Sequence, residues 1–277
     1  MITISLGRMG DIINVLPYLH QETRETGAKA QLMVSQEYAS ILEGTSYIQP
    51  TIYPGAWDDL GGAVRYAEKL GWPANEIRVA QVCGPKEIVK QEAYNKFQMN
   101  GKQAESFSKE AIRLLGRLDE WRNQYPLVFN SRNKAREQSI VEQYNPLTRW
   151  ILVATGGFSS PFPHKELLWS VLAQSYAQNH LIIDISTIVA ERFYDLLGLM
   201  EHPSVKCMVL TDSAPLHLAY AVNKPVCALI ADKPTLWHGT AYRPQQHISY
   251  IRYSEFPERT DELVSAINNI GKPGSAF

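Results

Sequence analysis

Apolar residues along the chain alternate between two spacings. Short apolar runs of the kind found in buried strands recur, separated by stretches with apolar residues three or four positions apart, as in helices. In the N-terminal half, the predicted strands are 2–6, 31–35, 48–53 and 77–83. The predicted helices of that half are 11–24, 36–43, 58–70, 86–98 and 104–122.

The C-terminal half repeats this alternation without repeating the sequence. Its predicted strands are 150–155, 180–185, 206–210, 225–230 and 247–252. Its predicted helices are 164–178, 188–199, 214–222 and 260–270. Alternating strands and helices favour parallel sheets covered by helices on both faces.

A polar stretch divides the two halves. Residues 123–148 are interrupted by Pro126 and Pro146, which is typical of a linker. We therefore expect an N-terminal domain over 1–135 and a C-terminal domain over 149–277. A length of 277 residues suits two α/β domains, and two such domains facing each other would form a deep ligand cleft.

Cysteine usage and the length of the apolar runs favour a cytoplasmic location. Cys83, Cys207 and Cys227 are odd in number and widely spaced, so a disulfide framework or a zinc ribbon is not expected. Each is predicted to be a small buried residue. The N-terminus reads as a strand and not as a secretory leader. No apolar run approaches the roughly 18 residues of a membrane span.

Positive charge is concentrated in one stretch, although the net charge is −1. Residues 78–136 hold 12 lysines and arginines against 6 acidic residues, whereas 1–77 hold 5 against 9 and 137–277 hold 10 against 13. The stretch is either a solvated surface or a binding site for a polyanion such as nucleic acid. Its cations include Lys86, Lys90, Lys96, Lys102, Lys109, Arg113, Arg117, Arg122, Arg132, Lys134 and Arg136.

The first candidate site is the turn between the first strand and the first helix, Gly7-Arg8-Met9-Gly10-Asp11. In an α/β protein this turn lies at the carboxyl edge of the sheet, where ligands bind. We expect Gly10 to permit a tight turn or the close approach of a ligand. Asp11 either caps the helix or faces the cleft as a base. The turn lacks the third glycine of a dinucleotide-binding fingerprint.

The second candidate site begins the predicted helix 214–222. Asp212 and Ser213 precede this helix, and Pro215 suits its first turn. The amides at such a helix start can bind an anion, or the segment is simply a well-capped helix. His217, one turn further on, is more typical of helix packing than of a functional role.

The third candidate site is the loop after the first strand of the C-terminal half. Gly156 and Gly157 expose backbone amides, and the loop adds hydroxyls and a cation that suit a diphosphate. The polar side chains are those of Thr155, Ser159, Ser160, His164 and Lys165. The loop is not a Walker-type phosphate loop, because GxxxxGK[ST] is absent, and a flexible serine-glycine loop is the alternative.

Taken together and in this order, the three segments resemble the lipopolysaccharide heptosyltransferases, glycosyltransferases that use ADP-heptose. The matching segments are GRMGDIINVLPYL, ATGGFSSP and TDSAPLHLAYAVNKPVCALI. The resemblance implies a GT-B fold, in which two Rossmann-like domains face each other across a cleft and the second binds most of the nucleotide sugar. Much of 25–148 matches only in the order of its elements.

The resemblance also implies roles for particular residues. Asp11 matches the proposed catalytic base, with Arg8 and Gly10 beside it on the acceptor side. The donor site is expected to contain Thr155, Gly156, Gly157, Ser159, Ser160, His164, Lys165, Asp212, Ser213, Ala214 and His217. A single cleft carboxylate suits a direct displacement, and no DxD-like motif calls for a metal. No cofactor beyond the nucleotide-sugar donor is expected.

Several functions remain open at this level. The acceptor is either a lipopolysaccharide-type glycan or DNA, for which the basic stretch would suit a phage-type base glycosyltransferase. A nucleotide-sugar epimerase and a non-catalytic nucleotide-sugar binder are alternatives that share the architecture. Donor nucleotide, sugar and oligomeric state do not follow from the sequence.

Overall fold

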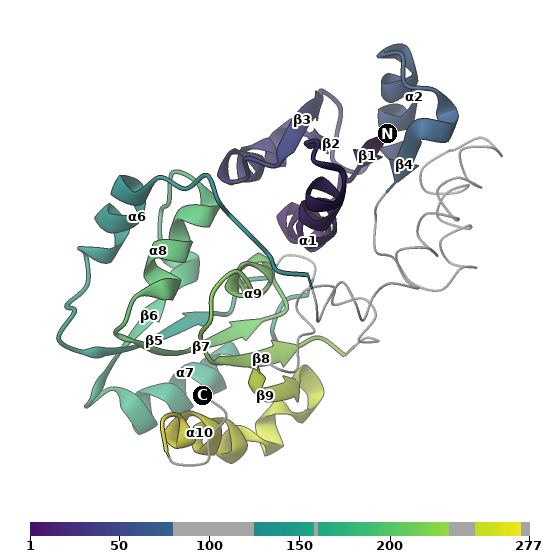
Figure 1. Ribbon diagram of the computed structural model, residues 1–277. Coiled ribbons are helices and arrows are strands. Elements are labelled where there is room, and N and C mark those ends of the chain that lie inside the picture. The colour runs from purple at the N-terminus through teal and green to yellow at the C-terminus, as the bar shows by residue number, and fades with distance from the viewer. Residues whose placement is uncertain (80–124, 158–159, 233–246, 273–277) are drawn as a thin grey trace. The chain divides into compact units, whose positions relative to one another are not determined.

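The computed structural model describes residues 1–79, 125–157, 160–232 and 247–272 (Figure 1). The chain divides into two compact units. Unit 1 comprises Met1–Arg132 and Pro234–Thr240, and unit 2 comprises Asn133–Lys233 and Ala241–Phe277. Each unit is built around its own parallel sheet, so the expected α/β class is confirmed.

The described part of unit 1 holds a four-stranded parallel sheet in the order β3-β2-β1-β4. Its strands are β1 (Ile2–Ile4), β2 (Ala30–Ser35), β3 (Ile48–Tyr53) and β4 (Ile77–Val79). Its helices are α1 (Met9–Thr26) and α2 (Leu60–Lys69), with 3₁₀ helices η1 (Gln36–Gly44) and η2 (Ala74–Glu76).

The order of these strands creates a topological switch point beside β1. The chain runs outward from β1 to β2 and β3 and then returns to pair β4 with the other side of β1. In open α/β sheets, ligands bind outside the carboxyl ends of the strands at such a point. The turn that contains Asp11 lies there, because it directly follows β1.

The described part of unit 2 holds a five-stranded parallel sheet in the order β6-β5-β7-β8-β9. The strands are β5 (Arg149–Ala154), β6 (His180–Asp184), β7 (Val205–Thr211), β8 (Val226–Ile230) and β9 (His247–Arg252). Here the direction reverses beside β5, because β6 lies on one side of it and β7 on the other. The carboxyl ends of β5 and β7 form this switch point.

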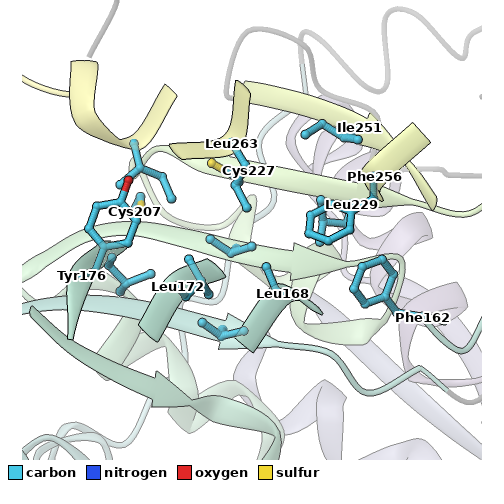
Figure 2. Packing of buried hydrophobic residues seen from close by; sticks show 14 of the residues in the cluster. Phe162, Leu168, Leu172, Tyr176, Cys207, Cys227, Leu229, Ile251, Phe256 and Leu263 are labelled. Atoms are coloured by element: carbon cyan, nitrogen blue, oxygen red, sulfur yellow. The ribbon is translucent and has the colours of Figure 1, made fainter. Parts of the chain in front are cut away.

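Helices cover both faces of this second sheet. These are α6 (Lys134–Val141), α7 (Lys165–Tyr176), α8 (Leu196–Glu201), α9 (Ala214–Ala219) and α10 (Thr260–Asn269). Figure 2 shows Leu168 and Leu172 of α7 and Leu263 of α10 packed with Leu229 and Ile251 from the sheet. The helices α8 and α9 lie over the opposite face, with α6 against α8 (Figure 1).

Most predicted elements form where the spacing of apolar residues places them, with one clear error. The predicted helix 188–199 is instead the 3₁₀ helix η4 (Phe193–Asp195) followed by α8, and the 3₁₀ helix η3 (Ile185–Thr187) precedes both. The buried Asp195 carboxylate accepts the Arg192 amide N–H at 3.0 Å, which holds Arg192 extended and delays the helix.

Two further segments differ from expectation or lie outside the described residues. The predicted linker contains α6, which begins at an Asn133 cap. β4 is described only to Val79, so the remainder of the predicted strand 77–83 and the predicted helices 86–98 and 104–122 lie outside the described residues. No helix among the described residues is both long enough and apolar enough to cross a membrane.

The described cysteines are buried and free. Cys207 of β7 and Cys227 of β8 pack in the core between the sheet, α7 and α10 (Figure 2). Burial raises the pKa of the Cys227 thiol, so it remains protonated near neutral pH. The predicted role of both residues as small core side chains is confirmed, and Cys83 lies outside the described residues.

Candidate functional site

Two of the segments singled out in the sequence meet at the switch point of unit 2. The Thr211 hydroxyl, at the end of β7, donates a hydrogen bond to the Ala154 carbonyl oxygen at the end of β5 over 3.1 Å. This bond holds the loop that follows β5 beside the turn that follows β7. The loop carries Thr155 to Lys165 and the turn carries Asp212 and Ser213, so the fold brings both predicted parts of a donor site together.

A buried tyrosine that directly follows a third strand, β9, hydrogen-bonds to both of these loops. The Tyr253 hydroxyl accepts the Asp212 amide N–H at 3.0 Å and donates to the Ser160 carbonyl oxygen at 3.2 Å. Burial first, and the neighbouring Asp212 carboxylate second, raise the pKa of Tyr253 above its ordinary value, so the phenol keeps its proton. The sequence analysis missed this residue, although its position directly after the predicted strand 247–252 puts it on the same edge.

The two glycines of the loop differ in the space around them. A methyl group on Gly157 would lie 2.8 Å from the Ser160 carbonyl oxygen and 3.4 Å from that of Asp212. A methyl group on Gly156 would meet only the Ser186 side chain, at 3.6 Å or more. Gly157 is therefore required by close backbone packing, whereas Gly156 is exposed and has room for a side chain.

The turn after β7 starts α9 as the sequence predicts. Ser213 is the N-cap residue, with Pro215 in the first turn, and the Ser213 hydroxyl donates to the Thr211 carbonyl oxygen at 3.0 Å. Asp212 is 8% exposed, and its amide is already bonded to Tyr253. His217 is 7% exposed and lies in the last turn of α9, a position typical of helix packing.

The other end of the loop joins α7. Lys165 is exposed as the first residue of α7. The His164 ring instead meets Phe162 edge-on at 5.8 Å and stacks on Phe256 at 6.2 Å. Lys165 is thus the cation that the loop presents to solvent. Thr155 is buried at the end of β5, and Ser159 lies outside the described residues.

In unit 1, Asp11 lies in the first turn of α1. Its carboxylate accepts the Arg8 amide N–H at 2.9 Å, while the residue remains exposed to solvent. Its side chain lies over Gly7, where a methyl group would come within 2.7 Å of the Asp11 carboxylate oxygen. The capping interpretation of Asp11 is therefore correct, and its exposure leaves a role as a base open.

Gly10 does not form the tight turn that was one of its two predicted roles, and the other role, the close approach of a ligand, stays a prediction. α1 begins at Met9, so Gly10 is helical and lies within the first turn. The close approach occurs instead at Gly7, two residues before the helix, because the Asp11 side chain folds back onto it. The amide of Arg8, the N-cap residue, then donates to that side chain and fixes the start of the helix.

Aromatic side chains from two other loops gather near Arg8 and Asp11. The Arg8 guanidinium lies 4.6 Å from the centre of the Trp57 ring, in the segment between β3 and α2. Tyr38 lies in η1 after β2. Burial first, and the hydrogen bond with Glu37 second, raise the pKa of Tyr38, while the Arg8 charge lowers this pKa and the Asp11 charge raises it. The carboxyl edge of this sheet thus carries polar and aromatic groups from three successive loops. The sequence analysis did not identify Tyr38 and Trp57 as site residues, because the only indication was that each follows a predicted strand.

The described cations of the basic stretch are occupied by protein groups. Arg78 is buried and contacts Glu22 at 2.6 Å. Lys134 contacts Glu137 at 2.8 Å, and Arg136 contacts the buried Asp195 at 2.8 Å. Arg78 and Arg136 are largely shielded and fit neither a solvated surface nor a polyanion site, whereas the Lys134 side chain is 69% exposed and fits the solvated surface. Arg132 also takes part in interactions, and the cations from Lys86 to Arg122 lie outside the described residues.

The described residues contain no group of three or more histidine, cysteine, aspartate or glutamate side chains that could hold a metal ion.

Comparison with known proteins gives structural matches. A scan of protein-family models finds no match, and a search of curated proteins finds none either. The structure of E. coli ADP-heptose LPS heptosyltransferase II matches with a TM-score of 0.60 and 12% identity, covering 98% of each chain.

Two further solved structures match over most of their length. The glycosyltransferase family 9 protein from Veillonella parvula DSM 2008 has a TM-score of 0.56 and 12% identity, covering 99% of this chain and 90% of its own. E. coli heptosyltransferase WaaC with ADP has a TM-score of 0.52 and 12% identity, covering 96% and 99%. The chain thus has the GT-B fold of the heptosyltransferases, as the resemblance of its sequence predicts.

Proposed function

We propose that this protein is a glycosyltransferase that moves a sugar from a nucleotide-diphosphate sugar to a hydroxyl of a glycan. The observation that carries the proposal is the meeting of the loops after β5 and β7 at the switch point of unit 2, fastened by Tyr253. Carboxyl edges at switch points are where α/β sheets bind ligands. We assign residues 149–277 to the donor and residues 1–135 to the acceptor.

The donor would bind through backbone and one cation. Gly156 and Gly157 leave the loop backbone accessible to a diphosphate, and Lys165 supplies a positive charge at its far end. Ala214, the first residue of α9, would direct its amide to the same group. We propose an adenosine diphosphate sugar, because the matching WaaC structure was solved with ADP.

The remaining predicted donor residues would act in three ways. Tyr253 holds the Asp212 and Ser160 backbones in place, so these residues shape the site and their side chains are secondary to its function. His164 contributes an apolar wall with Phe162. His217 supports α9 from its buried position.

In the reaction, Asp11 would take the proton of the acceptor hydroxyl as its oxygen attacks the anomeric carbon. The bond from that carbon to the diphosphate oxygen breaks, and the nucleoside diphosphate leaves with an added negative charge. Lys165 and the loop amides would stabilise this charge.

Glycan is favoured over DNA as acceptor. Duplex DNA is bound mainly through several cations that contact its phosphates. Arg78, Lys134 and Arg136 are already held by carboxylates of the protein. A sugar acceptor needs few such contacts, and aromatic faces such as that of Trp57 suit its ring.

The proposal is tested by supplying donors and acceptors separately. Calorimetry with ADP, UDP and GDP is expected to show one preferred nucleotide, ADP. Mass spectrometry of reactions with a panel of nucleotide sugars is expected to show transfer to a lipopolysaccharide-type glycan and none to duplex DNA. A protein that binds none of the three nucleotides at millimolar concentration would not be a glycosyltransferase. Binding without transfer would indicate a nucleotide-sugar binder, and a rearranged nucleotide sugar an epimerase.

A further inference from the structure

A basic hollow lies at the amino edge of the unit 2 sheet, the opposite edge from the proposed donor site. Its volume is about 640 Å³, which is in the range of sites for small molecules. Four basic side chains line it, with Asn223 and Ile270 beside them. The basic residues are Arg149, His180, Lys206 and Lys224.

The sheet itself gathers these charges. Arg149 and His180 are the first residues of β5 and β6 and lie opposite each other in the register. Lys224 precedes the start of β8 by two residues. Since the amino ends of parallel strands share one edge, residues far apart in the sequence converge there.

Lys206 reaches the same place through an irregularity in β7. Trp150 pairs with Val205 and Ile151 with Cys207, so Lys206 is an extra residue between the two pairs. Such bulges redirect a side chain. Its ammonium lies 6.0 Å from the centre of the Tyr176 ring, and that ring also meets His180 edge-on at 5.5 Å.

These cations have no acidic partner in the part of the chain that the structure describes. The Lys224 ammonium donates to the carbonyl oxygens of His202 and Val205, at 2.9 and 3.3 Å. By contrast, Arg136 and Arg259 in the same unit are each held by carboxylates. The positive charge of the hollow is therefore not neutralised by these side chains, as it is elsewhere in the unit.

The basic groups also act on one another. Burial and then the Arg149 charge lower the pKa of Lys224. Burial, then Lys206 and then Arg149 lower the pKa of His180, whose buried Nδ1 has no hydrogen-bond partner among the described residues. Like charges held together in a concave site cost free energy, and a bound anion would remove that cost.

We propose that this hollow binds a phosphate-bearing small molecule. A phosphate group accepts several charge-assisted hydrogen bonds at once, as the three converging cations Arg149, Lys206 and Lys224 require. The volume leaves room for the body of the ligand beside Asn223 and Ile270. The six residues of β5 separate this edge from the donor edge by about 17 Å, at roughly 3.3 Å per residue. The two sites are therefore distinct, and this inference does not depend on the proposed transferase activity.

The test is calorimetry with inorganic pyrophosphate as the probe. Arg149→Gln and Lys206→Gln are each expected to weaken binding at least about 10-fold, as loss of a hydrogen bond to a charged group does. Arg149→Lys keeps the positive charge and is expected to retain most of the affinity for pyrophosphate. The control is Lys29→Gln/Lys69→Gln, which removes two positive charges from exposed positions in unit 1, as Arg149→Gln/Lys206→Gln removes two from the hollow. This control is expected to bind pyrophosphate with the affinity of the wild type.

The Lys165→Gln variant separates this site from the donor site. Pyrophosphate binding that survives Lys165→Gln but is lost with Arg149→Gln/Lys206→Gln supports the hollow. Binding that is lost with Lys165→Gln but survives Arg149→Gln/Lys206→Gln would overturn the proposal, because pyrophosphate would then bind only at the donor site. Vesicles of phosphatidylcholine with and without phosphatidylglycerol distinguish a soluble phosphate from a lipid headgroup. Binding to the anionic vesicles without any pyrophosphate binding would also overturn the proposal.

Discussion

The Tyr253 hydroxyl lies 3.0 Å from the Asp212 amide nitrogen and accepts its hydrogen bond, joining the end of β9 to the turn after β7. The same hydroxyl donates to the Ser160 carbonyl oxygen at 3.2 Å. One buried phenol therefore holds both loops of the proposed donor site. Because it satisfies two backbone groups at once, the shape of the site depends on it.

Tyr253→Phe is expected to destabilise unit 2 and to weaken ADP binding. Loss of the hydroxyl leaves a buried amide and a buried carbonyl without their partner, at a cost of about 1–3 kcal/mol in the free energy of unfolding. Tyr47→Phe is the matched control, because the Tyr47 hydroxyl bonds to the Val128 carbonyl oxygen at 3.0 Å in unit 1. Urea denaturation and calorimetry with ADP measure both effects. Equal ADP affinity in the two variants would show that Tyr253 has no role in the site.

Gly157→Ala is expected to displace the loop after β5 and to reduce ADP affinity. The added methyl group would lie 2.8 Å from the Ser160 carbonyl oxygen, a contact closer than real Cβ atoms show. Overpacking of this kind costs about 1–3 kcal/mol. Gly156→Ala tests the adjacent position, where the nearest side-chain atom is 3.6 Å away, and is expected to bind ADP normally. If both variants behave alike in calorimetry, the close packing of Gly157 does not shape the donor site.

Asp11→Asn is expected to lower turnover about 10²–10⁴-fold, as loss of a general base does, with little change in ADP affinity or stability. The amide oxygen of asparagine can still accept the Arg8 N–H, so the start of α1 is preserved. Asp59→Asn is the control, because Asp59 caps α2 in the same unit by accepting the Gly62 N–H at 2.9 Å. Sugar transfer measured by mass spectrometry compares them. Turnover within a few-fold of wild type in Asp11→Asn would leave Asp11 as a helix cap only.

Stability is expected to fall as pH decreases below neutrality, in part through His202. Burial, and then the Lys224 charge, lower the pKa of His202 below its ordinary value of 6.5. Its Nδ1 accepts the Ser204 N–H at 3.2 Å, which requires the neutral ring. A histidine with a lowered pKa in the folded state contributes stability that is fully present above the unfolded pKa and is lost as pH falls from there through the lowered folded pKa.

Urea denaturation at pH 7.5 and pH 5.5 measures this dependence. His202→Gln keeps a hydrogen-bond acceptor but cannot titrate. Its free energy of unfolding is therefore expected to fall less between pH 7.5 and pH 5.5 than that of the wild type. His20 and His180 also have lowered pKa values and account for a remaining slope. An unchanged slope in His202→Gln would contradict the assignment.

Sequence patterning determined the order of the elements. The hydrophobic spacing located β2 almost to the residue, because a buried parallel strand is a short apolar run and its flanks are polar. The start of α9 was also readable, because Ser213 and Pro215 suit the cap and the first turn. The pattern failed over 188–199, where the Asp195 carboxylate accepts the Arg192 amide N–H three residues before it and also pairs with Arg136 from far along the chain.

The sequence alone thus determined the alternation of strands and helices, the three loops that carry polar residues, and their place after strands. Only the tertiary structure decided which loops meet. Strand order within a sheet depends on pairing between segments far apart in the chain, and no local periodicity records it. For the same reason Tyr253 and the four basic residues of the amino edge could not be assigned beforehand, since their neighbours come from different strands.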